Sequence, residues 1–291
     1  MNVKSSTYKG YHSVITKHLT PNLGEIKLVK LNALQIQHFY KKISETTHPN
    51  MAHYIHRILT ISLNQAVKLK LININPTTLV EIPKKEKTSF QVCDEDDIKH
   101  FLNITQKSRY HIAYILAITT GMRLGEILGL RWQDVDLKSK TISINQTLSP
   151  DNQLVLDTKT SSSRRLISID ERTIEALQKH KSKINIEKIR LGPSYIDHNL
   201  IVCTKIGNII CRGGFHDTFK TYIKKSGIKD IRFHDLRHTH AILLLKQGVH
   251  PKVVSERLGH KDIYITLNRY SHVLPGMQEA AIKMFSENLF G

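Results

Sequence analysis

The sequence predicts a mainly α-helical protein that carries a small antiparallel β-sheet. Apolar residues recur at helical spacing along most of the 291 residues. Within 141–169 the segments TISI, LVL and RLISI alternate or are rich in β-branched residues, which predicts a short antiparallel meander. LIVCT at 200–204 predicts one more short strand. The helices therefore make up most of the predicted fold.

Residues 1–82 are interpreted as a small all-helical domain, because strand signals are absent there. Residues 7–19 place tyrosine, valine, isoleucine and leucine at helical spacing. Asn32 followed three positions later by Gln35 is typical of a capping box and predicts the start of a helix. Asn50 is predicted to open the next helix.

A linker is predicted at 83–89, where Pro83 precedes a run of charged residues. The second domain, 90–291, opens with Asp94 as the expected N-cap of a helix that has acidic residues in its first turn. Its other predicted helices are 109–119, which ends at Gly121, an amphipathic helix over 171–189, a helix that Gly227 stops, and helices beyond 234 that are separated by Gly248, Gly259 and Pro275.

The charge of the chain points to a polyanionic partner. There are 43 lysines and arginines against 25 aspartates and glutamates, a formal net charge of +18, and such a balance is typical of nucleic-acid-binding proteins. Residues 1–88 hold 13 basic and 4 acidic residues, whereas 89–291 hold 30 and 21. The N-terminal third is therefore the more densely charged part, which indicates a separate module that contacts phosphates.

The composition gives no sign of a membrane or a secreted protein. No run approaches the ~18 consecutive apolar residues of a membrane helix, and the N-terminal stretch lacks the apolar region of a signal peptide. The three cysteines, Cys93, Cys203 and Cys211, form no CxxC pair. We therefore expect small buried thiols and a cytoplasmic protein rather than a disulfide framework.

The segment RFHDLRHTHA, residues 232–241, concentrates cationic side chains just before an apolar run. His234 and Arg237 are three positions apart, so they share one face of a helix. A guanidinium can bind phosphate through two hydrogen bonds, and an adjacent histidine can bind a third oxygen or transfer a proton. This pattern favours anion binding, and His238 and His240 are expected to have packing or supporting roles.

A zinc site is the alternative for this segment. His234 and His238 have the spacing of two zinc ligands, but Asp235 stands where the HExxH motif has glutamate, no third ligand is evident, and Arg237 would repel the cation. We therefore expect no metal.

Four other segments offer single candidate residues. Arg123 follows a helix that ends at Gly121, with Glu126 three positions on as its support. Lys159 lies in a polar turn between two strands, His260 follows Gly259, and Tyr270 lies on a later helix. Taken singly, each has an ordinary explanation as a solvated or packed side chain.

Taken together, the order and spacing of these residues resemble the tyrosine recombinase (phage integrase) family. The resemblance is carried by TGMRLGEILGL, TKTSSSRR, HDLRHTHA, LGH and RYSHV, and the pattern between residues 8 and 40 is similar to the family's core-binding domain. The sequence looks most like integrases of phages and conjugative transposons of Gram-positive bacteria. The resemblance implies a helical core-DNA-binding domain at 1–82 and an α+β catalytic domain at 90–291.

The resemblance also implies a site-specific recombinase that cleaves DNA through a 3′-phosphotyrosyl intermediate and rejoins strands through a Holliday junction. Tyr270 would be the nucleophile, and Arg123 and Arg237 would bind the two non-bridging phosphate oxygens. His234 would accept the tyrosine proton or bond the phosphate, and His260 would donate to the same phosphate.

Two further residues complete the implied site. Lys159 would protonate the leaving oxygen, and Glu126 would support Arg123. No cofactor, metal or ATP is expected, because the arginines and the lysine supply the positive charge that a metal would otherwise provide.

The implied partners are double-stranded DNA attachment sites and three further copies of the chain, which would be a monomer or weak oligomer when free and a homotetramer on DNA. A directionality factor and a host DNA-bending protein are candidate accessory proteins, and no membrane is involved. An amphipathic helix at 275–290 is predicted to pack on its own domain or in trans on a neighbouring protomer. Related integrases carry an additional N-terminal arm-binding domain, so this chain is expected to be a truncated or a simpler member.

Three other functions remain open at this point. A recombinase that resolves chromosome dimers and a type IB topoisomerase would use the same catalytic residues. A non-catalytic DNA-binding protein would use Tyr270 only for packing.

Overall fold

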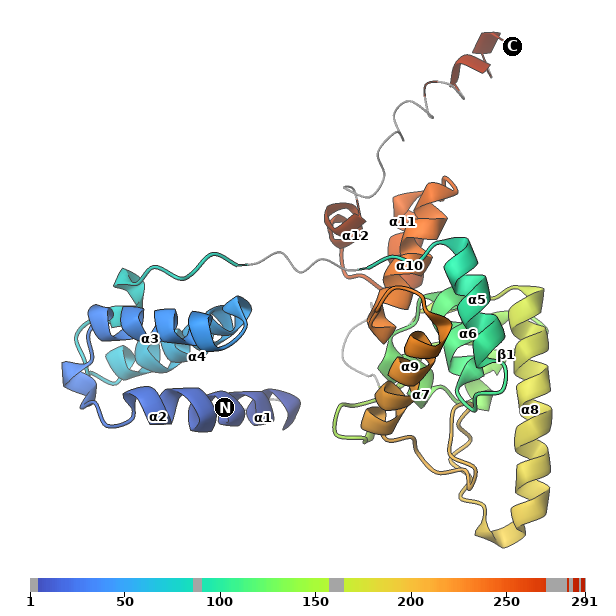
Figure 1. The fold of residues 1–291 in the computed structure, drawn as a ribbon, viewed down its shortest axis with the longest axis horizontal. Helices are drawn as coiled ribbons and strands as arrows, with labels where there is room; N and C mark the ends of the chain where they lie inside the picture. Colours follow the sequence, from blue (N-terminus) through green and yellow to red (C-terminus); the bar gives the residue numbers. More distant parts are fainter. Residues whose placement is uncertain are drawn as a thin grey trace. The chain divides into compact units, whose positions relative to one another are not determined.

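The computed structural model describes residues 5–85, 91–156 and 165–270, together with 282, 285–287 and 289–290. The chain divides into two compact units, Met1–Ser89 and Phe90–Gly291 (Figure 1). Lys159 lies outside the described residues, as does most of the predicted tail helix 275–290. The linker at 83–89 and the tail therefore stay predictions.

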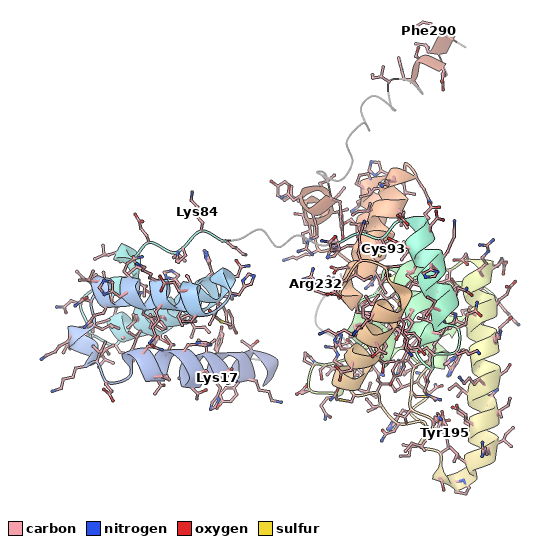
Figure 2. All side chains as sticks on the ribbon, viewed as in Figure 1. Lys17, Lys84, Cys93, Tyr195, Arg232 and Phe290 are labelled. Carbon is pink, nitrogen blue, oxygen red and sulfur yellow. The ribbon has the colours of Figure 1, made fainter. Side chains whose placement is uncertain are left out.

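The first unit consists of helices and turns throughout its described part, residues 5–85. Its elements are α1 (Ser5–Val14), a π-helical turn (Ile15–Leu19), α2 (Thr20–Leu23), α3 (Ala33–Thr46) and α4 (Pro49–Lys68), with 3-10 turns at Leu28–Lys30 and Pro76–Leu79. Ile36, Tyr40 and Ile55 are fully buried in its core. Lys17, which Figure 2 labels on the first of these helical runs, is exposed.

The two predicted helix starts in this unit differ in outcome. The capping box is confirmed: Asn32 Oδ1 accepts from the Gln35 backbone N–H and Gln35 Oε1 accepts from the Asn32 backbone N–H, each at 3.0 Å. The prediction that Asn50 opens α4 is wrong. His48 caps this helix through its Nδ1, which accepts from the Asn50 N–H at 3.2 Å, and Pro49 occupies the first turn, where a missing N–H costs nothing.

The second unit is built from helices around a main apolar core, with two smaller apolar clusters beside it. Its helices are α5 (Glu95–Thr105), α6 (His111–Thr120), α7 (Leu124–Gly129), α8 (Glu171–Leu191), α9 (Arg212–Ser226), α10 (Phe233–Lys246), α11 (Pro251–Leu258) and α12 (Ile263–Tyr270). Asp94 caps α5 by accepting from the Asp97 N–H at 2.8 Å, as predicted. Aromatic rings from four of the helices meet in the core, for example Tyr114 with Phe215 and Phe233 with Phe219. Within the described residues no helix is both long and apolar enough to cross a membrane.

The mainly helical fold with small antiparallel sheets is confirmed, but the single meander is wrong. β2 (Thr141–Ser143) lies between β1 (Val135–Asp136) and β5 (Leu166–Ser168), while β3 (Gln146–Leu148) pairs with β4 (Leu154–Leu156) in a separate sheet. Burial explains the separation: Ile142 faces Ile167 across β2 and β5, and both enter the core, whereas Val155 and Leu156 of β4 are exposed.

The strand predicted at LIVCT is also absent, apart from an isolated bridge between Arg131 and Leu200. Ile201, Val202 and Cys203 are all buried, so their side chains do not alternate between a core face and a solvent face. The guanidinium of Arg109 donates to the carbonyls of Cys203 and Thr204, at 2.5 and 2.6 Å. The Arg109 side chain thus occupies two backbone carbonyls to which the N–H groups of a neighbouring strand would otherwise donate.

The expectation of buried thiols holds for two of the three cysteines. Cys93 and Cys203 are buried, but Cys211 is exposed at the N-terminus of α9. Hydrogen bonds from the Gly214 and Gly213 backbone N–H groups lower the pKa of this thiol.

We expect Gly121→Ala to destabilise the protein more than Gly227→Ala does. Both glycines follow a helix with a φ of 66°, and a left-handed conformation costs a non-glycine residue about 1–2 kcal/mol. A Cβ at Gly121 would also lie 2.6 Å from His240 Cδ2 and 2.7 Å from Leu258 Cδ2, whereas nothing lies within 4 Å of a Cβ at Gly227. Overpacking of this kind adds about 1–3 kcal/mol. Chemical denaturation of both variants measures the difference, and equal losses of unfolding free energy would contradict the packing described here.

Candidate active site

Arg123 is placed by the turn between α6 and α7. α6 ends at Gly121, and Arg123 occupies the N-cap position of α7. Its backbone N–H donates to Glu126 Oε2 at 2.9 Å, its Nη1 to Glu126 Oε1 at 2.8 Å, and its Nη2 to the Gly259 carbonyl at 3.1 Å. These hydrogen bonds hold the guanidinium in place. Because 43% of the side chain is exposed, the group is still accessible to a ligand.

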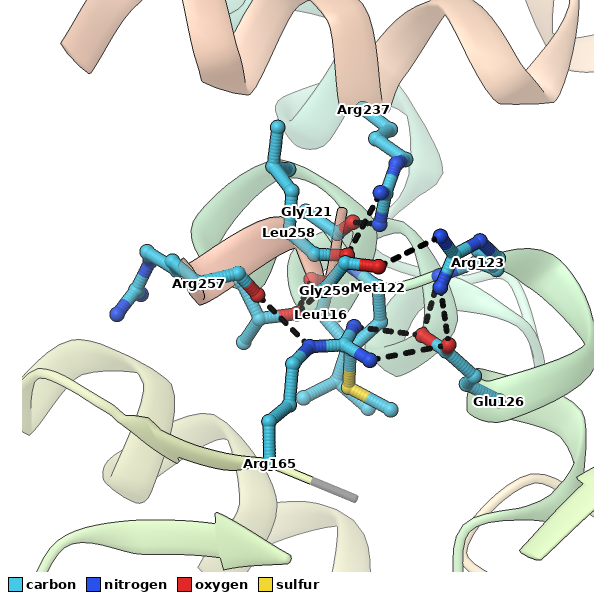
Figure 3. A network of polar contacts seen from close by, with 11 residues as sticks. Leu116, Gly121, Met122, Arg123, Glu126, Arg165, Arg237, Arg257, Leu258 and Gly259 are labelled. Atoms are coloured by element: carbon cyan, nitrogen blue, oxygen red, sulfur yellow. Dashed lines mark hydrogen bonds and ion pairs between the residues drawn. The ribbon is translucent and has the colours of Figure 1, made fainter. Parts of the chain in front are cut away.

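Glu126 also binds a second arginine, Arg165, which no motif in the sequence indicates. Arg165, just before β5, donates to both Glu126 oxygens, at 3.1 and 2.8 Å, and its Nε donates to the Arg257 carbonyl at 2.8 Å (Figure 3). Burial alone would raise the pKa of Glu126, but the hydrogen bonds and charge of Arg165 and the charge of Arg123 lower this pKa to about 2. The carboxylate is therefore ionised at neutral pH and offsets the charge of two guanidinium groups.

Arg237 on α10 is almost completely buried, with 3% of its surface exposed. Its Nη1 donates to the Gly121 carbonyl at 2.6 Å and its Nη2 to the Leu258 carbonyl at 2.7 Å. Burial and the neighbouring charge of Arg123 lower the pKa of Arg237 to about 9. Since a desolvated, repelled cation gains most from a nearby anion, this position is suited to bind phosphate.

His234 lies one helical turn before Arg237 and is exposed. Partial burial of its ring is the main cause that lowers the pKa of His234, and the charge of Arg237 is the second. Its ring meets that of His238 edge-on, with centroids 4.8 Å apart. His234 is thus an accessible imidazole beside the buried guanidinium.

His260 follows the turn that ends α11, where Gly259 has a φ of 67°. Its Nδ1 is 2.8 Å from the hydroxyl of Thr266 on α12. Burial, followed by the charges of Arg237 and Arg123, lowers the pKa of His260 to about 4. His260 is therefore neutral at neutral pH and lies within electrostatic reach of both arginines.

Tyr270 is the last residue of α12, and 1% of its surface is exposed. Its hydroxyl lies 2.8 Å from Nδ1 of His238. Burial raises its pKa, although Arg237 and Arg269 act in the opposite direction. The phenol is consequently protonated at neutral pH.

The remaining histidines of the RFHDLRHTHA segment differ from each other. His240 has the supporting role expected of it, since its Nδ1 contacts the Ile118 carbonyl at 2.7 Å and its Nε2 accepts from Arg257 Nε at 3.1 Å. His238 contacts the candidate nucleophile directly. The i, i+4 spacing with His234 could have suggested proximity, but nothing in the sequence relates His238 to Tyr270.

The structure thus brings Arg123, His234, His260 and Tyr270 close enough to Arg237 for their charges to interact, and Arg165 and His238 join them. Lys159 lies outside the described residues. Among the residues that the structure describes, no three His, Cys, Asp or Glu side chains are grouped so that they could hold a metal ion.

Models of known protein families match both units. The model described as the phage integrase family matches residues 91–276, and the model described as the phage integrase N-terminal SAM-like domain matches residues 1–44.

Similar proteins cover nearly the whole chain. A "Tyrosine recombinase XerC-like" protein of Caldanaerobacter subterraneus is 27% identical over 99% of this chain and 79% of its own length. The ICEBs1 integrase of Bacillus subtilis is 27% identical over 95% of this chain and 76% of its own.

Solved structures of integrases on DNA share the fold. The Tn1549 transposon integrase in complex with a circular intermediate DNA matches with a TM-score of 0.81 and 19% identity, over 97% of this chain and 95% of that one. A lambda integrase tetramer bound to a Holliday junction matches with a TM-score of 0.69 and 20% identity, over 90% and 73%.

We expect Glu126→Gln to lower the free energy of unfolding by about 3 kcal/mol at pH 7. This value follows from the difference between the carboxyl pKa of about 2 in the folded protein and its ordinary value of 4.5. Because the folded-state pKa is lowered, this stabilisation is present above about pH 4.5 and is lost as the pH falls toward 2. The difference between the parent protein and the variant should therefore shrink over that range in denaturation experiments.

Glu256→Gln is the matched control. Glu256 pairs with Lys252 at 3.3 Å, but both side chains are more than half exposed, so its loss should change stability by less than ~1 kcal/mol. A loss for Glu126→Gln that is independent of pH would contradict the ionised, buried carboxylate.

Proposed function

Because the chain belongs to the phage integrase family, we propose that it is a site-specific tyrosine recombinase that integrates or excises a mobile element. The observation that carries this proposal is the arrangement of Arg123 and Arg237. Both guanidinium groups bond to carbonyls of the same turn, Leu258–Gly259, which also leads to His260 and to the helix that bears Tyr270. Two cations fixed in this way fit a single phosphodiester beside a tyrosine hydroxyl.

Strand cleavage by a tyrosine has three chemical requirements. The phenol, with an ordinary pKa of ~10, must lose its proton. The five-coordinate phosphorane gains negative charge, which must be stabilised where it develops. The leaving 5′-oxygen must receive a proton. The phosphotyrosyl ester keeps the energy of the broken bond, so rejoining to another 5′-hydroxyl needs no ATP.

We assign the phosphate-binding roles to the cationic side chains. Arg123 and Arg237 bind the two non-bridging oxygens, and His260, which is neutral, donates a hydrogen bond to the same phosphate. His234 bonds the phosphate or accepts the tyrosine proton. Lys159 protonates the leaving oxygen. Glu126 holds Arg123 in place and takes no part in the chemistry.

DNA binding is shared between the two units in this proposal. The basic first unit is the core-DNA-binding domain, and the second unit binds the DNA that it cleaves. Since the contacts are mainly to phosphates, affinity should fall steeply as salt rises. In this proposal the two units, joined by 83–89, contact one duplex together.

Strand exchange also requires an assembly. We propose that four copies bind two attachment sites and exchange strands through a Holliday junction, as the tetrameric lambda integrase structure supports. The tail 275–290 docks on its own domain or on a neighbouring copy, and a directionality factor or DNA-bending protein regulates the outcome. The proposed place of action is the cytoplasm.

Resolution of chromosome dimers is the second candidate function, because a relative named XerC-like matches almost the whole chain. The two functions differ in their protein requirement. Recombination of one site that needs a second, different recombinase would favour chromosome-dimer resolution, whereas recombination by this chain without such a partner would favour integration or excision.

We expect the protein to form a covalent adduct with a suicide DNA substrate that is nicked near the cleavage site, and Tyr270→Phe to abolish the adduct because the nucleophile is gone. Tyr264→Phe is the matched control, since Tyr264 lies on the same helix with 64% of its surface exposed. Denaturing gel electrophoresis measures the adduct. Formation of the adduct by Tyr270→Phe, or its absence in the parent protein and all variants, would contradict the proposed chemistry.

Cleavage should continue in EDTA, because guanidinium groups supply the charge that stabilises the phosphorane. The single-turnover rate on the suicide substrate, measured with and without EDTA, tests this. A strict dependence on Mg²⁺ would contradict the assigned roles of Arg123 and Arg237.

A further inference from the structure

His238 and Tyr270 form a buried contact that the roles assigned above do not use. Nδ1 of His238 lies 2.8 Å from Oη of Tyr270, a normal hydrogen-bond distance. The two residues are 4% and 1% exposed, and their rings meet edge-on with centroids 5.7 Å apart. Bulk water therefore does not compete for this bond.

The neutral state of both groups allows the phenol to be the donor in this bond. Burial, followed by the neighbouring charges of His234 and Arg269, lowers the pKa of His238 to about 3, so this imidazole is neutral. Burial raises the pKa of Tyr270, so the phenol keeps its proton. In the tautomer that carries its proton on Nε2, His238 presents a lone pair at Nδ1, and the phenol O–H donates to it.

The contact also joins the nucleophile to the phosphate-binding helix. His238 is the residue after Arg237 on α10, whereas Tyr270 ends α12. Within the described part of α12, the buried residues are Thr266 and Tyr270, and Thr266 bonds His260. The bond to His238 thus directs the phenol toward the turn of α10 that carries the buried guanidinium.

We propose that His238, rather than His234, is the base that receives the Tyr270 proton. As the Oη–P bond forms, the proton passes from Oη to Nδ1 of His238, while the P–O5′ bond breaks and the 5′-oxygen takes a proton from Lys159. On rejoining, His238 returns its proton to the phenol. His234 is then left to bond the phosphate. This inference rests on the proposed recombinase function.

DNA binding is expected to make His238 a stronger base. Among the described residues, the charged and titratable groups that face His238 include His234, Asp235 and Arg237 on its own helix and Arg269 and Tyr270 on α12. A bound phosphodiester places a negative charge beside these arginines and reduces their repulsion of a protonated imidazole. The pKa of His238 therefore rises when DNA binds, toward the range in which it can accept a proton.

The test compares His238→Leu and His238→Asn in single-turnover cleavage of the suicide substrate. Leucine fills similar space without an acceptor, and the asparagine amide can accept the phenol hydrogen bond but cannot take its proton. Both variants should bind DNA as the parent protein does and should cleave roughly 10²–10⁴-fold more slowly, the usual range for loss of a general base. If His238→Leu does not fold, His238→Asn alone gives the same comparison.

A substrate with sulfur at the 5′-bridging position distinguishes loss of the general acid from loss of the general base, because a thiolate leaves without being protonated. This substrate should restore cleavage to Lys159→Ala and should not restore it to His238→Asn. Parent-like cleavage by His238→Asn, or its rescue by the sulfur substrate, would overturn the assignment of His238 as the base. Absence of the adduct in the parent protein would instead overturn the recombinase function itself.

Discussion

The carboxylate of Glu126 holds two arginines of a strongly basic chain at one place in the second unit. Arg165 donates to both of its oxygens, and Arg123 reaches them through its side chain and its backbone N–H. An ionised carboxylate offsets the repulsion between the guanidinium groups and part of the cost of burying them. Because Arg123 opens α7, and Arg165 lies before β5 and also binds the Arg257 carbonyl, this contact fixes the relative positions of α7, β5 and α11.

Main-chain turns complete the surroundings of the site. The Gly121 and Leu258 carbonyls orient Arg237, and the Gly259 carbonyl orients Arg123. The two glycines adopt left-handed backbone conformations, and a Cβ at Gly259 would lie 2.8 Å from Nη1 of Arg165. The guanidinium groups are thus held in fixed orientations, which the proposed phosphate binding requires, because preorganised donors stabilise transition-state charge without reorganisation.

Local sequence signals predicted the parts of the fold that depend on local chemistry. The Asn32 capping box and the helix stop at Gly121 are set by residues a few positions apart, and both were predicted. The separation of the sheets and the loss of the strand at 200–204 depend on long-range burial and on the Arg109 side chain, which no local pattern reports. The same reason explains the two residues that no local pattern reports: Arg165 lies 39 positions from Glu126, and Tyr270 lies 32 positions from His238.

Peptide mapping of the adduct tests most directly whether Tyr270 becomes covalently joined to DNA, as proposed. Trypsin cleavage after Arg269 and Lys283 releases a peptide whose only tyrosine is Tyr270. After nuclease digestion of the attached strand, mass spectrometry should find a phosphate on Tyr270, and end-labelling should show that the tyrosine was joined to the 3′ end of the cleaved strand. A phosphate on any other residue, or a linkage to the 5′ end, would contradict this account.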